Sequence, residues 1–186
     1  MGYHTYDASR ADNLEDAAKR YRYCSAEELL GALSLSGTET VADLGSGTGF
    51  YTDDVAPVAG TVHAVDVQSA MLDYYRDKGL PENVEPVTAE VADLPFADDG
   101  LDAAFSTMTY HEFAEEAAID ELGRVLASGS RLVVVDWSSA GRGEAGPPVD
   151  ERYSASDASE ALSAAGFDVV REDIRPETFV VVATAP

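Results

Sequence analysis

The sequence predicts an α/β fold, in which a doubly wound, mainly parallel sheet of seven strands has helices on both faces and ends in a C-terminal antiparallel hairpin. Strand-like apolar runs alternate with helix-like segments, which produces right-handed crossovers between parallel strands. Residues 133–135 are all valine, as expected for a strand buried on both faces. Only a tight turn at Arg175 and Pro176 separates the last two strands, so they should pair as a hairpin.

The expected elements follow an N-terminal helical stretch, residues 11–35, in which Ser25 and Glu28 form a capping box that starts a second helix. The expected strands cover residues 40–43, 61–67, 83–88, 101–107, 131–136, 167–174 and 177–184. The expected helices cover residues 50–56, 69–78 (capped by Ser69), 112–126 and 156–165. We therefore predict an N-terminal helical lid segment, residues 1–36, followed by one domain, residues 37–186.

The charge of the chain is unusual. Its 186 residues are 45% hydrophobic, which is enough for a packed core, yet 35 acidic residues face only 12 lysines and arginines, for a net charge of −23. The acids are scattered, and such a coat repels itself at low salt and is screened at high salt. We interpret the coat as halophilic adaptation, with an ordinary acidic protein as the alternative. Nucleic acid is not an expected partner, because binding to its backbone relies on basic patches.

Other features limit location and chemistry. Cys24 is the single cysteine, so neither a disulfide framework nor a multi-cysteine zinc site can form within one chain, and we expect no metal. No apolar run approaches a membrane span, and the N-terminus lacks the apolar stretch of a signal peptide. We therefore expect a cytoplasmic protein with no membrane partner; a homodimer stays open.

A glycine-rich loop follows the first expected strand. Residues 41–49 read Val-Ala-Asp-Leu-Gly-Ser-Gly-Thr-Gly, where glycines let the backbone turn sharply and a ligand approach closely. The dinucleotide fingerprint G-x-G-x-x-G fails, because Phe50 occupies its sixth position. Asp43 precedes the glycines, and an acid there suits an amino group or a sulfonium better than a pyrophosphate. A plain glycine turn is the alternative.

Two further acids follow the next strands. Asp66 ends the second strand, where a carboxylate can accept hydrogen bonds from both ribose hydroxyls, although it could instead cap the following helix. Asp93 lies in the loop after the third strand and could accept from an adenine amino group, or be a solvated turn acid. With the glycine loop, these acids predict a nucleoside-type cofactor.

In order and spacing, these motifs resemble those of class I S-adenosylmethionine-dependent methyltransferases, in particular the ubiquinone/menaquinone-biosynthesis type. The resemblance covers about residues 38–137 and rests on residues 43–49, Asp66, the sequence Asp-Leu-Pro-Phe at 93–96 and residues 122–130. It departs where Ser-Gly-Ser at 128–130 replaces the usual Pro-Gly-Gly, a turn with a structural role.

The resemblance implies a Rossmann-like domain, S-adenosyl-L-methionine as the cofactor and a small-molecule methyl acceptor. It also implies that Asp43 and the glycines hold the methionine end, Asp66 the ribose, and Asp93 with the Leu94 backbone the adenine. The expected cofactor-binding residues are Asp43, Gly45, Ser46, Gly47, Gly49, Asp66, Val67, Met71, Asp93, Leu94 and Thr107.

The candidate catalytic residues, His111 and Tyr110, follow the fourth strand, whose carboxyl end should line the ligand crevice. Family members often carry a histidine where His111 stands, and histidine can accept a proton near pH 7. Methyl transfer from a sulfonium is an in-line displacement for which positioning can suffice. A pocket-lining or helix-capping role for His111 therefore stays open. His63 lies within a strand and is expected on a sheet face.

The N-terminal segment is rich in tyrosine and arginine from Tyr3 to Tyr23. Similar enzymes fold such a segment over the active site as a lid, which can exclude water. We expect Arg20 and Tyr21 to contact the acceptor, with simple packing against the core edge as the alternative.

The predicted function is transfer of a methyl group to a small molecule. Carbon or oxygen acceptors are favoured, because arsenite methylation needs several thiols and residues 107–110 lack the Asn-Pro-Pro-Tyr type of sequence used on amino and amide groups. A catalytically inactive regulatory protein that binds S-adenosylmethionine is one alternative. A nucleotide-cofactor oxidoreductase is another, but it leaves Asp43 without a role.

Overall fold

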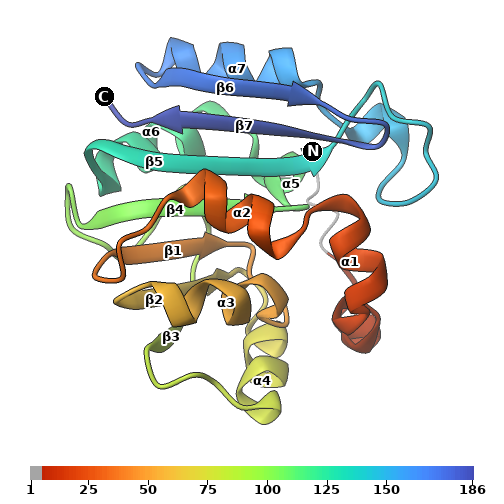
Figure 1. The fold of residues 1–186 in the computed structure, drawn as a ribbon, viewed down its shortest axis with the longest axis vertical. Coiled ribbons are helices and arrows are strands. Elements are labelled where there is room, and N and C mark those ends of the chain that lie inside the picture. The colour runs from red at the N-terminus through yellow and green to blue at the C-terminus, as the bar shows by residue number, and fades with distance from the viewer. Residues whose placement is uncertain (1–5) are drawn as a thin grey trace.

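A single seven-stranded sheet organises the molecule (Figure 1). The computed structural model describes residues 6–186, so Tyr3 lies outside the described residues. The strand order is β3-β2-β1-β4-β5-β7-β6, with β1 to β5 parallel and β7 antiparallel to both of its neighbours. The strands are β1 Thr40–Leu44, β2 Thr61–Asp66, β3 Val84–Thr88, β4 Leu101–Thr107, β5 Leu126–Trp137, β6 Asp168–Ile174 and β7 Thr178–Thr184. The predicted fold class, including the C-terminal hairpin, is confirmed.

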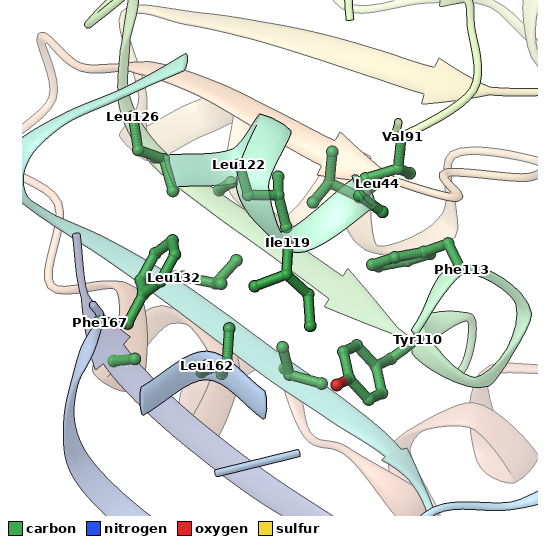
Figure 2. Packing of buried hydrophobic residues seen from close by; sticks show 14 of the residues in the cluster. Leu44, Val91, Tyr110, Phe113, Ile119, Leu122, Leu126, Leu132, Leu162 and Phe167 are labelled. Carbon is green, nitrogen blue, oxygen red and sulfur yellow. The ribbon is translucent and has the colours of Figure 1, made fainter. Parts of the chain in front are cut away.

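Helices cover both faces of this sheet. The α-helices are α1 Ala17–Tyr23, α2 Ala26–Leu33, α3 Phe50–Val55, α4 Ser69–Lys78, α5 Tyr110–Phe113, α6 Glu116–Val125 and α7 Ala155–Ala164. Within the described residues, the 3-10 helices are η1 Ala8–Glu15, η2 Ala56–Val58 and η3 Val149–Glu151. Buried side chains of α2, α3 and α4 form one apolar cluster with the sheet, and those of α5, α6 and α7 form the other, which Figure 2 shows from close by. None of the helices in the described part of the chain is long and apolar enough to cross a membrane.

The position of β5 inside the sheet explains why residues 132–135 are apolar. Successive side chains of a strand point to opposite faces of the sheet. Leu132 and Val134 therefore join the cluster under α6 and α7, while Val133 and Val135 join the cluster under α2 and α3. Because both faces are covered, no polar position is tolerated in this stretch.

Several boundaries differ from those expected. Ser69 does not cap α4 but is its first residue, and the capping position belongs to Gln68, whose side chain makes no capping hydrogen bond. The expected helix 112–126 is divided into α5 and α6, because Ala114 leaves helical geometry and Glu115 is extended. At the N-terminus Asp16 caps α1, while Ser25 accepts the Glu28 N–H and starts α2, as the sequence predicts.

The N-terminal segment divides into two parts with different roles. Leu29 and Leu33 of α2 are fully buried against the sheet, so residues 26–36 belong to the main layer rather than to a lid. The preceding elements η1 and α1 lie beyond the carboxyl ends of the parallel strands (Figure 1). Within the N-terminal segment, only the residues before α2 can therefore cover a site at that edge.

Candidate functional site

A cavity of about 510 Å³ opens at the carboxyl ends of the parallel strands. Its size lies within the usual range for small-molecule sites, and this edge is where ligands bind in open α/β sheets. The residues that line it come from the glycine loop, the loops after β2, β3, β4 and β5, and the N-terminal segment. Nine predicted site residues are among them: Arg20, Gly45, Ser46, Gly47, Asp66, Val67, Met71, Thr107 and His111.

The glycines of the loop have different roles. Gly45, Gly47 and Gly49 all have positive φ angles, between 55° and 78°. A Cβ atom at Gly45 would clash with the side chain of Thr109, and one at Gly49 with the ring of Tyr75. At Gly47 the nearest atom would be a methyl carbon of Leu14 at 3.6 Å, which is ordinary contact. Packing therefore requires the outer two glycines, whereas Gly47 leaves open space beside the cavity.

Asp43 is buried at the start of this loop and does not itself line the cavity. One carboxylate oxygen accepts a hydrogen bond from the Thr52 hydroxyl at 2.6 Å, and the other has no partner among residues 6–186. Burial raises the pKa of Asp43 to about 7, while Thr52 and Arg20 act in the opposite direction. Placing a cation nearby would favour the charged form of this carboxyl. Ser46 likewise has a buried hydroxyl oxygen without a partner in the described chain.

Asp66 joins the glycine loop to α4. Its two oxygens accept the backbone N–H groups of Gly47 and Gln68, both at 2.8 Å. Burial raises the pKa of this carboxyl. A carboxylate has about four acceptor positions, so Asp66 can still accept hydrogen bonds from a ligand in the cavity that it lines.

The structure places Asp93 and Leu94, the residues expected to contact adenine, outside the lining of the cavity. Asp93 is exposed and does not line the cavity, and the Leu94 N–H donates to the carboxylate of Glu121 at 2.8 Å. A turn closed by a hydrogen bond from Asp93 N–H to the Glu90 carbonyl carries the chain away from the site. Glu90, three residues earlier, lines the cavity instead.

His111 is paired with a buried acid that sequence analysis missed. Asp136, at the end of β5, is 0% exposed, and both of its oxygens lie 3.0 Å from His111 Nδ1. Asp136 also accepts the backbone N–H groups of His111 at 2.6 Å and Trp137 at 2.8 Å. The signal that could have identified this pair is the adjacency of β4 and β5 in the sheet. Asp136 lies at the carboxyl end of β5, and His111 follows the carboxyl end of β4.

The pairing determines the chemistry of the imidazole ring. A carboxylate only accepts hydrogen bonds, so Nδ1 carries a proton and Nε2 of the neutral ring is the acceptor. Burial alone would lower the pKa of His111, but the hydrogen bond and charge of Asp136 raise it above the usual value. Glu112 Oε1 lies 3.9 Å from Nε2, and burial raises the pKa of Glu112 to about 7. This arrangement can hold a proton at Nε2.

Two other predicted residues point away from the cavity. Tyr110 is 1% exposed and packs edge-on against Phe113, Tyr153 and Phe179, inside the core shown in Figure 2. This residue of the short helix α5 therefore faces the core and does not line the cavity. The Tyr21 ring packs on Phe50, and its hydroxyl donates to Asp54 at 3.0 Å, so Tyr21 does not line the cavity.

The loop after β5 lines the cavity with Gly146 and Pro147. The buried guanidinium of Arg152 donates to the Pro147 carbonyl at 2.9 Å, and Glu177 accepts the Arg142 N–H at 2.8 Å. Tyr23 of α1 packs against Trp137 with ring centroids 4.7 Å apart. Arg22 and Glu144 form an ion pair of 2.7 Å between α1 and this loop. The cavity is thus covered by α1 and the loop together.

Comparisons with known proteins agree with this geometry. A family described as "Methyltransferase domain" matches residues 42–134. A S-adenosylmethionine-dependent methyltransferase from Aquifex aeolicus has 32% sequence identity and a TM-score of 0.86, over 98% of this chain and 100% of that one. A putative methyltransferase in a complex with the Haloferax volcanii Trm112 methyltransferase activator shares the fold, with a TM-score of 0.80, 20% identity and coverage of 96% and 97% of the two chains.

Curated relatives are similar over a shorter stretch. The demethylmenaquinone methyltransferase of Clavibacter sepedonicus is 30% identical over 148 residues, which are 78% of this chain and 53% of that protein. The ubiquinone/menaquinone biosynthesis C-methyltransferase of Vibrio campbellii is 33% identical over 108 residues, which are 54% and 42% of the two chains. The chain thus spans about half the length of these relatives. Family match, fold and site together show that the chain belongs to the class I S-adenosylmethionine-dependent methyltransferases, whose cofactor is S-adenosyl-L-methionine.

Proposed function

We propose that this chain methylates a carbon or oxygen atom of a small molecule, and that His111 removes the proton from the attacking atom. The observation that carries the proposal is the His111–Asp136 pair at the cavity, with Nδ1 held by the buried carboxylate. The two curated relatives named for quinone methylation support a small-molecule acceptor.

The side chains present fit the cofactor. The unpartnered hydroxyl oxygen of Ser46, which lines the cavity, suits the amino group of its methionine end, with the unpartnered Asp43 oxygen buried at the start of the same loop. Asp66 suits the ribose hydroxyls. Glu90 replaces Asp93 as the acid that can accept from the adenine amino group. When bound, the cofactor supplies a methyl group on a positively charged sulfur, which a nucleophile displaces in line.

The protein residues then have three tasks. Neutral His111 accepts the acceptor's proton at Nε2, and the buried charge of Asp136 stabilises the imidazolium that forms. Asp136 also holds the ring in one orientation through its second contact, to the His111 backbone N–H. Tyr23 and Trp137, with Gly146 and Pro147, exclude water from the reacting atoms.

A panel of small acceptors tests the proposal. The protein is incubated with S-adenosylmethionine and phenols, catechols or reduced quinones, including reduced demethylmenaquinone, and mass spectrometry follows the products. We expect a product enlarged by one methyl group, with an equal amount of S-adenosylhomocysteine. Tight cofactor binding without turnover on any acceptor class would favour the inactive regulatory alternative.

Asp66 provides a test of the cofactor site. Changing Asp66 to Ala should weaken S-adenosylmethionine binding about tenfold to a hundredfold, because losing a hydrogen bond to a charged group costs about 1.5–3 kcal/mol. Isothermal titration measures the change. Asp93→Ala is the matched control, since Asp93 lies outside the cavity, and it should bind like the wild type. Equal affinities of the two variants would remove Asp66 from the site.

Deleting the segment before α1 tests whether the N-terminal lid covers the cofactor site. Leu14 lies beside Gly47, the carbonyl of Tyr6 accepts a hydrogen bond from the Gln68 amide, and Glu15 contacts Thr48 and Lys78. Deleting residues 1–15 should therefore weaken cofactor binding at least about tenfold and lower turnover with it. Deleting residues 1–5 is the control. A deletion of residues 1–15 that leaves cofactor affinity intact would limit the segment to the acceptor side.

A further inference from the structure

The positive charges of this acidic chain are distributed unevenly. Of its 12 lysines and arginines, eight form ion pairs with carboxylates. These eight are Arg22, Arg76, Lys78, Arg124, Arg142, Arg152, Arg171 and Arg175. The other four are Arg10, Lys19, Arg20 and Arg131, none of which forms an ion pair with a carboxylate of residues 6–186.

Three of these four cations line the cavity at the carboxyl ends of the parallel strands, and Arg131 lines a second cavity of about 410 Å³. Arg131 donates to the Ala32 carbonyl at 2.7 Å, whereas Arg10, Lys19 and Arg20 lie on consecutive elements of the N-terminal segment and face the cavity. The acids of the cavity, Asp66, Glu90, Glu112 and Glu115, come from other elements, namely the loops and short helix that follow β2, β3 and β4. All lysine and arginine side chains that line the cavity therefore come from the N-terminal segment.

The cofactor needs only part of this charge. S-adenosylmethionine carries one carboxylate against an amino group and a sulfonium, so it is a net cation that the overall charge of −23 attracts. Arg20 is placed to serve that carboxylate, because its guanidinium lies 4.8 Å from the ring centroid of Tyr51, just after the glycine loop, and its Nε atom has no partner in the described chain. Arg10 lies over the Tyr6 ring, 5.9 Å from its centroid, and the side chains of Arg10 and Lys19 form no hydrogen bond or ion pair within residues 6–186.

We propose that the methyl acceptor carries an anionic group, a carboxylate or a phosphate, and that Arg10 and Lys19 bind it. This inference rests on the proposed function. A neutral acceptor would need no cations, whereas an anion has to enter against the field of a highly acidic protein and requires local positive charge to stay. Arg10 and Lys19 supply that charge at the cavity while His111 acts on the attacking atom of the same molecule.

The test uses two simple anions on the protein saturated with S-adenosylhomocysteine. Malonate, pyrophosphate and the neutral malonamide are titrated at constant ionic strength. We expect the wild type to bind an anion but not malonamide, and Arg10→Gln/Lys19→Gln to bind it about tenfold or more weakly. A preference for malonate indicates a carboxylated acceptor, and a preference for pyrophosphate indicates a phosphorylated one. The control, Arg76→Gln/Arg171→Gln, removes the same charge from residues outside the cavity and should bind like the wild type.

Two results would overturn the inference. If both double variants bind the anions like the wild type, or if the wild type binds neither anion, Arg10 and Lys19 are solvated charges only. If Arg10→Gln/Lys19→Gln loses affinity for S-adenosylhomocysteine but not for 5′-methylthioadenosine, which lacks the carboxylate, the two cations bind the cofactor instead. Failure of the wild type to bind S-adenosylhomocysteine would contradict the proposed function, and anion titration of the ligand-free protein would still decide the inference.

Discussion

Replacing His111 by Asn should lower the rate of methyl transfer at least about a hundredfold, because general-base catalysis contributes about 10² to 10⁴. The asparagine amide can still donate to Asp136 from near the position of Nδ1, but no atom remains at the position of Nε2. Affinity for S-adenosylmethionine should stay unchanged, since the glycine loop, Asp66 and Glu90 are untouched. The measurements are single-turnover rates at saturating cofactor and isothermal titration.

His63→Asn is the matched control for this variant. His63 lies on the sheet face of β2 against Phe96, outside the cavity, so its replacement should leave the rate of methyl transfer near that of the wild type. Full activity of His111→Asn would show that positioning alone drives the reaction and that His111 only lines the cavity.

The pH dependence of the rate provides an independent check. The base acts as the neutral imidazole, so the rate should rise with pH as His111 loses its proton. Because Asp136 raises the pKa of His111, the rise should occur at higher pH than for an ordinary histidine, whose pKa is about 6.5. Asp136→Asn removes the charge that favours the imidazolium, so the rise should move to lower pH. An unchanged pH profile of the rate in this variant would show that the pH dependence does not arise from His111.

Replacing Gly47 by Val should reduce S-adenosylmethionine binding at least about a hundredfold, a loss of roughly 2.7 kcal/mol. Gly47 has a φ angle of 55°, and its missing side chain leaves space beside the cavity and Leu14. A branched side chain there would fill the space that the cofactor's approach to the backbone requires, and it would strain the left-handed conformation. Isothermal titration measures the loss, and circular dichroism should show a largely intact sheet.

Gly129→Val is the control for the effect of backbone strain alone. Gly129 has a φ angle of 78° and open space around an added Cβ atom, and it does not line the cavity. This variant should therefore carry a similar strain and still bind S-adenosylmethionine. If both variants bind equally well, the glycine loop does not approach the cofactor at Gly47.

Local sequence patterns predicted most of the fold. The bounds of β4 agree with the expected strand at residues 101–107, because a short, mainly apolar run that follows a glycine turn is a signal carried by neighbouring residues. The division of the expected helix 112–126 at Ala114 was not predictable in this way, since no proline or glycine marks it. Serine is a residue type that commonly caps helices, yet Ser69 is the first residue of α4 and Gln68 occupies the capping position.

Within the site, residues fixed by a motif were easier to predict than residues on irregular backbone. Gly47 and Asp66 lie where the strand–loop–helix pattern places them, at the ends of adjacent parallel strands. Asp93 and Glu90 occupy the same turn, and only the path of that turn decides which acid faces the cavity. Tyr110 and His111 are adjacent on α5, and their opposite directions follow from how this short helix docks on the core.

The sequence by itself determined the order of strands and helices, the hairpin, the glycine loop and a nucleoside-type cofactor. Each of these is encoded by residues close together in the chain, where periodicity and turn chemistry act directly. Only the tertiary structure decided that Asp136, 25 positions away, holds His111, and that Arg10 and Lys19 meet the cavity without an acid partner. Those relations depend on which strand ends become neighbours and on where the N-terminal segment docks, because long-range packing brings these side chains together.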